Sequence, residues 1–224
     1  MKKNIQFNRE YAGRFRQGFL ENNVPWYKEI GLSGHTGVDF ANGYGTPVRA
    51  MNDGVVYKIA YAKDSPSNWQ GVYILSEYDD DKYIEQCYGH LSQVNIRLGD
   101  TVTRGQVIGL EGNKGKVYQG GVEITPAMQR AGDKRGSHTH YSYRPVIFRP
   151  IEVPVKGLFY LETVDGKIYT SNYDETFTGC FEIFNQNERT RGHIDPLVFS
   201  VGTEIISLQQ KVIDLLKQLL LLKK

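Results

Sequence analysis

The sequence has little of what marks several specialised protein classes. Its two cysteines, Cys87 and Cys180, do not make a disulfide framework. A net charge of only +2 gives no support for nucleic-acid binding. No stretch is long and apolar enough to span a membrane, and the first ten residues lack the apolar core of a signal peptide. We therefore expect a soluble chain without a visible export signal.

The remaining composition is that of a β-rich globular protein. Hydrophobic residues make up 40% and charged residues 23% of the 224 residues, and this length is enough for a buried core. The chain has 24 glycines, 15 tyrosines and few long helical patterns. We predict a mainly β fold with an antiparallel sheet core, resembling a sandwich or barrel, and with long loops that form a groove. A pI near 8.4 is compatible with an anionic polymer such as a cell wall but does not require one.

Two histidines share a predicted strand near the middle of the chain. Residues 136–143 are rich in aromatic and β-hydroxyl side chains and predict a strand. Because side chains alternate along a strand, His138 and His140 are expected on one face, with their Cα atoms about 6.6 Å apart. That spacing lets one imidazole bind a metal ion while the other lies beside an open ligand position.

Three further residues could complete such a site. His35 and Asp39 would lie about 13 Å apart in an extended strand, so sharing one metal requires a bend, for which Gly37 is best suited. Taken alone, this pattern better fits a surface turn. His90 ends a predicted strand over residues 82–91, where an isolated histidine is usually structural. Cys87 faces the other side of that strand and is expected to be a small buried residue.

Turn residues indicate how the strands are connected. Asn52-Asp53-Gly54 predicts a hairpin between residues 46–51 and 55–61, and Asp165-Gly166 predicts another in the later part of the chain. Residues 116–135 read as a long loop, which fits either one wall of a substrate groove or a tolerated surface insertion.

The chain ends in a segment of different character. Residues 201–224 predict an amphipathic helix. The helix has three interpretations, which are a cover for a patch of its own domain, self-association, and binding to a membrane surface. Its apolar residues recur at alternating steps of three and four: Ile205, Leu208, Val212, Leu215, Leu219 and Leu222.

Together these motifs resemble the lysostaphin-type (LytM-like) zinc endopeptidases, which cleave peptidoglycan peptides and have the duplicated hybrid motif fold. The resemblance runs from about residue 34 to 143. It implies a domain over residues 31–200 with an insertion at 146–190, preceded by a lead-in at 1–30 packed on the domain. The matching motifs are His35-x-x-x-Asp39, Tyr88-Gly89-His90-Leu91, His138-x-His140, the segments 45–48, 53–56 and 99–109, and the closing Asp195-Pro196-Leu197.

The resemblance also assigns roles. It makes His35, Asp39 and His140 the ligands of one Zn²⁺ per chain, and it makes His90 and His138 the catalytic pair. Thr139 and Ser137 depart from the leucine and proline that are common at these places in the family, and the loop before His138 is longer than usual. These departures spare the ligands but leave the substrate specificity open.

The chemistry is consistent with hydrolysis. Two histidines and one carboxylate leave a fourth tetrahedral position for water, as in catalytic zinc sites. Because the chain has no H-E-x-x-H motif, one of His90 and His138 is expected to take the proton from water while the other donates to the tetrahedral oxyanion.

Several alternatives remain at this point. D-Ala-D-Ala carboxypeptidases also use an H-x-H motif, but their first motif separates His and Asp more widely. A non-catalytic wall-binding or activator module would typically have lost ligands, and a structural phage component would only grip the wall. The substrate, bacterial peptidoglycan, lies outside the cytoplasm. A phage lysin, a virion-associated hydrolase or a fragment of a longer precursor would each explain the missing signal peptide.

Overall fold

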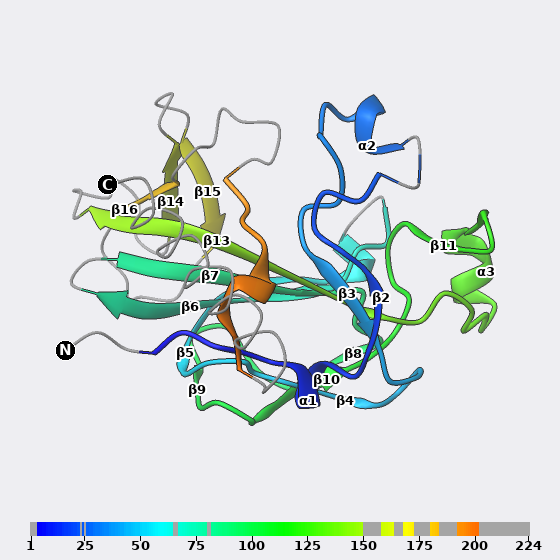
Figure 1. The fold of residues 1–224 in the computed structure, drawn as a ribbon, viewed down its shortest axis with the longest axis horizontal. Helices are drawn as coiled ribbons and strands as arrows, with labels where there is room; N and C mark the ends of the chain where they lie inside the picture. The colour runs from blue at the N-terminus through cyan, green and yellow to red at the C-terminus, as the bar shows by residue number, and fades with distance from the viewer. Residues whose placement is uncertain are drawn as a thin grey trace, which may run out of the picture.

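The computed structural model describes residues 4–22, 24, 26–64, 67–79, 82–149, 158–163, 168–172, 180–183 and 192–201. Most of its regular structure is β (Figure 1), as predicted. The helical elements are short: α1 (Arg9–Ala12), α2 (Trp26–Glu29), α3 (Pro126–Arg130) and the 3-10 turns η1 (Ala62–Asp64) and η2 (Pro196–Phe199). None of the helices in these ranges has the length and apolarity needed to cross a membrane. The helix predicted at 201–224 lies, apart from residue 201, outside the described residues.

One large sheet dominates the described residues. Its neighbouring strands are antiparallel except for the parallel pair of β14 (Leu158–Thr163) and β16 (Cys180–Ile183). At one end of β13 (Thr139–Arg149), β3 (Val38–Ala41) pairs with β13 and also with β2 (Arg14–Gln17). Apart from β2 and β3, the strands follow in the order β15 (Ile168–Asn172), β14, β16, β13, β7 (Lys82–Gly89), β6 (Gly71–Asp79), β5 (Gly54–Ala60) and β9 (Thr101–Val102).

Three smaller sheets complete the described strands. β4 (Pro47–Arg49), β10 (Val107–Leu110) and β8 (Gln93–Val94) form one of them. The others are the hairpin of β11 (Val117–Gln119) and β12 (Val122–Ile124), and the parallel pair of β1 (Phe7–Asn8) and β17 (Ser200–Val201).

One predicted hairpin is wrong and another is confirmed. β4 pairs with β10, and β5 pairs with β6 and β9, so residues 52–54 connect two sheets instead of closing a hairpin. The Asn52 side chain is buried and bonds Gln6 and Gln86, and a Cβ at Gly54 would lie 2.4 Å from the Leu75 carbonyl oxygen. Asn52 and Gly54 are therefore required by the packing around them and do not form a hairpin turn. The hairpin around 165–166 is confirmed by the antiparallel pairing of β14 with β15.

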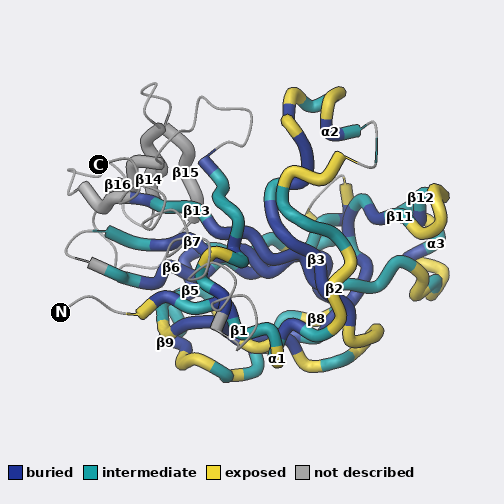
Figure 2. The backbone as a smooth tube through the Cα atoms, in the orientation of Figure 1, coloured by how far each residue is buried: buried dark blue, intermediate teal, exposed yellow. Residues whose placement is uncertain are grey.

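The core lies beneath the middle of the large sheet, where the strands are buried (Figure 2). Phe7 from the N-terminal segment is fully buried, and its ring centroid lies 5.5 Å from that of Phe40 and 5.4 Å from that of Tyr141. Complete burial of such a side chain stabilises the fold by roughly 1.5–3 kcal/mol. The N-terminal segment thus contributes to the core that supports β3 and β13.

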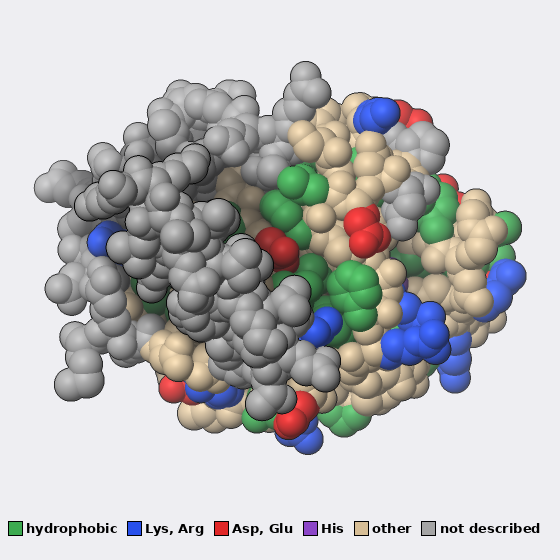
Figure 3. Space-filling view, in the orientation of Figure 1, with side chains coloured by type: hydrophobic (Ala, Val, Ile, Leu, Met, Phe, Trp, Pro, Cys, Tyr) green, Lys and Arg blue, Asp and Glu red, His purple; other side chains and the backbone are tan. Residues whose placement is uncertain are grey.

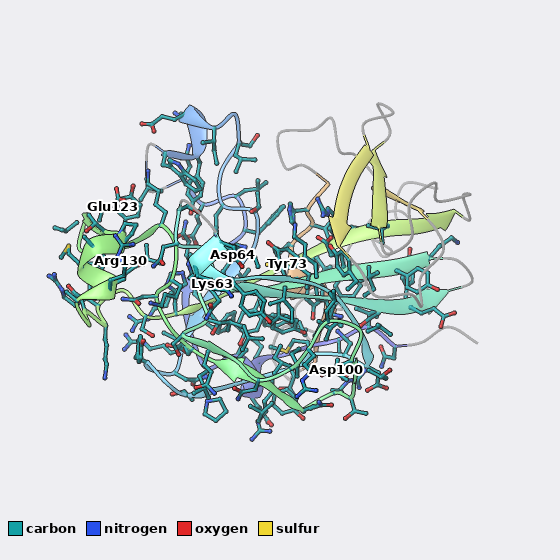
Figure 4. All side chains as sticks on the ribbon, turned by 180° about the vertical axis from the view of Figure 1, so that it is seen from behind. Lys63, Asp64, Tyr73, Asp100, Glu123 and Arg130 are labelled. Carbon is teal, nitrogen blue, oxygen red and sulfur yellow. The ribbon has the colours of Figure 1, made fainter. Side chains whose placement is uncertain are left out.

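The expected long loop at 116–135 contains regular structure. Gly120 and Gly121 have φ angles of 58° and 79°, which suit the tight turn between β11 and β12. Thr125 caps α3 by accepting a hydrogen bond from the Met128 N–H. Figure 4 places Glu123 of β12 and Arg130 of α3 together at one end of the molecule.

Candidate metal centre

Two neighbouring strands and a bend bring three donor side chains together. β3 and β13 are paired so that Asp39 lies opposite His140. The backbone bends at Thr36 and Gly37, just before β3, which returns the His35 side chain to the same place. The bend expected from the sequence is therefore present.

The donor atoms of these three residues nearly touch. Asp39 Oδ1 lies 3.1 Å from His35 Nε2 and 3.1 Å from His140 Nδ1, and the two ring nitrogens are 2.8 Å apart. All three residues are buried, with at most 9% of their surface exposed, and little histidine surface is visible in Figure 3. Among the described residues, this is the group of histidine, cysteine and acidic side chains with the spacing of a metal site.

The donor set fits a tetrahedral zinc ion. With bonds of about 2.0–2.2 Å, tetrahedral ligand atoms lie roughly 3.3–3.6 Å apart, so the three donors need only small outward shifts. His35 Nδ1 lies 3.1 Å from the Gly18 carbonyl oxygen, to which it donates, and Nε2 therefore keeps its lone pair for a metal. Three protein ligands leave a fourth position open.

The two remaining histidines lie beside this group. His138 Nε2 is 3.3 Å from Asp39 Oδ2, and the rings of His90 and His138 have centroids 4.4 Å apart. Each ring uses Nδ1 to donate to a backbone carbonyl, that of Lys114 for His90 and that of Gly136 for His138, both at 2.7 Å. Both histidines therefore keep Nε2 for other partners. The structure thus brings together all five residues that the sequence suggested.

Burial and mutual charge set the ionisation of the group. Burial opposes the charged form of Asp39, but His138 and His35 outweigh it and hold the pKa of Asp39 well below its usual value. Burial also disfavours a charged His35, yet Asp39 raises the pKa of that ring. The pKa of His140 is lowered by burial. Burial, together with the neighbouring His138, lowers the pKa of His90 well below its ordinary value, so its ring is neutral at pH 7.

Two glycines allow the close packing around the site. A Cβ at Gly37 would lie 2.2 Å from the Tyr141 carbonyl oxygen and 2.7 Å from His140 Cε1. A Cβ at Gly89 would lie 2.2 Å from the Trp69 ring, which stands 4.8 Å from the His90 ring between centroids. Neither position has room for a side chain.

The structure adds aromatic residues that sequence reasoning missed. Trp69 contacts His90 and lies 6.3 Å from His140 between ring centroids, and its Nε1–H donates to the Tyr73 hydroxyl. The Tyr27 ring lies 5.9 Å from that of His35 between centroids, and the Trp26 ring lies 5.7 Å from Tyr27 at an interplanar angle of 52°. The chain has only two tryptophans, and both lie in this neighbourhood. That scarcity was the one signal in the sequence that could have drawn attention to them.

Two paired strands and the bend before β3 thus bring two histidines and one carboxylate together, with two more histidines beside them, and such a donor set is typical of metal-dependent hydrolases. A model described as peptidase family M23 matches residues 33–145, just over half of the chain, and the chain belongs to this family. The family resemblance expected from the motifs is thereby confirmed.

Known relatives match about half of the chain. Glycyl-glycine endopeptidase ALE-1 of Staphylococcus capitis is 38% identical over 107 residues, which are 47% of this chain and 27% of that protein. Peptidoglycan DD-endopeptidase ShyA of Vibrio cholerae serotype O1 is 33% identical over 125 residues, 54% of this chain and 24% of that protein. The match thus spans about a quarter of the length of these curated relatives. The solved catalytic domain of lysostaphin from Staphylococcus simulans aligns with 58% of this chain and 79% of its own, at 24% identity and a TM-score of 0.40.

Proposed function

We propose that this chain is a zinc-dependent endopeptidase that hydrolyses peptide bonds in bacterial peptidoglycan. The observation that carries the proposal is the convergence of His35, Asp39 and His140 within hydrogen-bond distance of one another, with two more histidines beside them. Membership of a peptidase family supports hydrolysis. The names of the relatives, a glycyl-glycine endopeptidase and a peptidoglycan DD-endopeptidase, support a cell-wall substrate.

His35 Nε2, His140 Nδ1 and Asp39 Oδ1 would hold the ion. When bound, zinc supplies Lewis-acid polarisation of the scissile carbonyl and a water whose pKa is lowered toward about 7. The protein contributes a rigid, buried ligand set. His140 and Asp39 are fixed by the pairing of β13 with β3, and His35 is fixed by its hydrogen bond to the Gly18 carbonyl.

We assign proton transfer to His90 and oxyanion stabilisation to His138. His90 is neutral at pH 7 and donates through Nδ1 to the Lys114 carbonyl, so its Nε2 can accept the proton of the attacking water. His138 donates through Nδ1 to the Gly136 carbonyl, so Nε2 carries a proton only in the imidazolium form, which Asp39 Oδ2 at 3.3 Å would balance; in that form Nε2 can donate to the developing oxyanion. Each ring is held in one orientation by its backbone carbonyl.

Digestion of purified peptidoglycan tests the proposal. We expect the chain with zinc to release peptide fragments, the chelated chain to release none, and added zinc to restore the activity. His138→Ala is expected to keep one zinc per chain while losing hydrolysis, whereas His140→Ala should lose both. Mass spectrometry of fragments from walls with different cross-links would identify the cleaved bond. Wall binding without any zinc-dependent fragment would refute hydrolysis and support a binding module.

A further inference from the structure

A buried acidic residue outside the donor group links two segments of the site. Glu111 follows β10 and is only 1% exposed. Among the described residues, none forms an ion pair with its carboxylate. Its carboxylate instead accepts hydrogen bonds from neutral donors. A buried carboxylate is tolerated only when its oxygens are hydrogen-bonded, so these donors indicate that Glu111 has a structural role.

The first two partners are backbone N–H groups just beyond β3. Glu111 Oε2 accepts from Asn42 N at 2.7 Å, and Oε1 accepts from Gly43 N at 2.9 Å. These residues follow the strand that carries Asp39. The carboxylate therefore holds the chain where it leaves β3, three residues after a proposed metal ligand.

The third partner precedes the paired histidines. The Ser137 hydroxyl donates to Glu111 Oε1 at 3.0 Å. The next residue after Glu111 continues the connection, because His138 N donates to the Gly112 carbonyl at 3.0 Å. Residues 111–112 thus hold both the Ser137 side chain and the His138 backbone.

We propose that Glu111, acting through Ser137, is a positioning residue that holds His138 against Asp39. One carboxyl group bonds both the end of β3 and the residue before His138, so it sets the separation between the Asp39 carboxylate and the His138 ring. Only the predicted effects on kcat and KM rest on the proposed function.

Ser137→Ala removes one hydrogen bond and leaves the three proposed ligands untouched. We expect zinc affinity within about twofold of the parent and KM unchanged, while kcat falls by roughly tenfold or more, since small misplacements of catalytic groups cost up to about a hundredfold. Ser137→Thr keeps the hydroxyl and should restore most of kcat. A kcat within twofold of the parent in Ser137→Ala would overturn the proposal.

Glu111→Gln places an amide N–H₂ group among donors and should lower kcat at least as much. Because both changes break the same link, the double variant is expected to lose no more than Glu111→Gln alone. Independent losses that multiply would overturn the proposal. Asp100→Asn is the matched control, because the Asp100 carboxylate accepts a hydrogen bond from the Arg97 N–H at 2.8 Å and so caps its own turn between β8 and β9. Its kcat should stay at the parent value.

A measurement on the metal-free protein separates this inference from the proposed function. The imidazole NMR signals of His138 report its position whether or not the chain hydrolyses anything. We expect them to shift in Ser137→Ala and Glu111→Gln and to stay in place in Asp100→Asn. If they are unchanged in the first two variants, the positioning role is refuted. If the parent releases no peptidoglycan fragment, only the proposed function fails.

Discussion

His90 has a backbone conformation that residues other than glycine rarely adopt. Its φ angle is 63°, in the left-handed region, where a side chain costs roughly 1–2 kcal/mol. The surrounding structure maintains this conformation, since the Lys114 carbonyl accepts from His90 Nδ1 and Lys114 N donates back to the His90 carbonyl. Strain of this kind is frequently found at functional sites.

A comparison of His90→Ala with His90→Gly measures this strain. Both variants lose the imidazole, so its packing cancels in the difference. Glycine relieves roughly 1–2 kcal/mol of strain but costs about 0.4–1 kcal/mol through the greater entropy of the unfolded chain. We therefore expect His90→Gly to be more stable than His90→Ala by about 0.8 kcal/mol, or about fourfold in the folding equilibrium constant.

Urea unfolding of the metal-free variants, followed by tryptophan fluorescence, gives the difference as a shift of the midpoint at constant slope. The control is the exposed residue Thr101 of β9, which has no positive φ angle. There Thr101→Gly should be less stable than Thr101→Ala by about 0.5–1 kcal/mol, the usual order in a strand. If the His90→Ala variant were as stable as the His90→Gly variant, the left-handed conformation and the reasoning from it would be wrong.

Three further predictions follow from other buried groups. Gly37→Ala should cost about 1–3 kcal/mol of stability and abolish stoichiometric zinc binding, measured by metal analysis, because its Cβ would collide with the Tyr141 carbonyl. Burial, reinforced by Glu85, raises the pKa of Tyr57 well above 10. Folding stability should therefore be intact below pH 10 and fall as the pH rises further, which melting temperatures between pH 8 and 11 would reveal. Burial also raises the pKa of Cys87 to about 12, so the thiol should not react with iodoacetamide at pH 8 in the folded protein. Peptide mapping measures this reaction, and rapid labelling would contradict the burial of Cys87.

The site residues were predictable because each carries its chemistry in its residue type and spacing. Alternation along a strand predicted that His138 and His140 share a face, and both contact Asp39. The long separation of His35 from Asp39 in an extended chain predicted a bend, which the structure has at Thr36 and Gly37. The roles of these residues stay predictions until the variants are assayed.

Strand pairing was less accessible from the sequence. The turn residues 52–54 predicted a hairpin, but β4 joins β10 and β5 joins β6. A local turn signal says nothing about which distant strand offers the better partner. The same limitation hid Trp69, which precedes β6, because its importance depends on the space left by Gly89 at the end of β7.

By itself, the sequence determined which donors are available, the β-rich class of the fold and the shared face of two histidines, because these depend on residue type and on alternation along one strand. Only the tertiary structure decided that residues 101 positions apart, Asp39 and His140, lie opposite each other, because strand register is set by the packing of the whole core. It also decided the left-handed backbone of His90 and the shared carboxylate of Glu111. Both depend on contacts between segments that no local pattern connects.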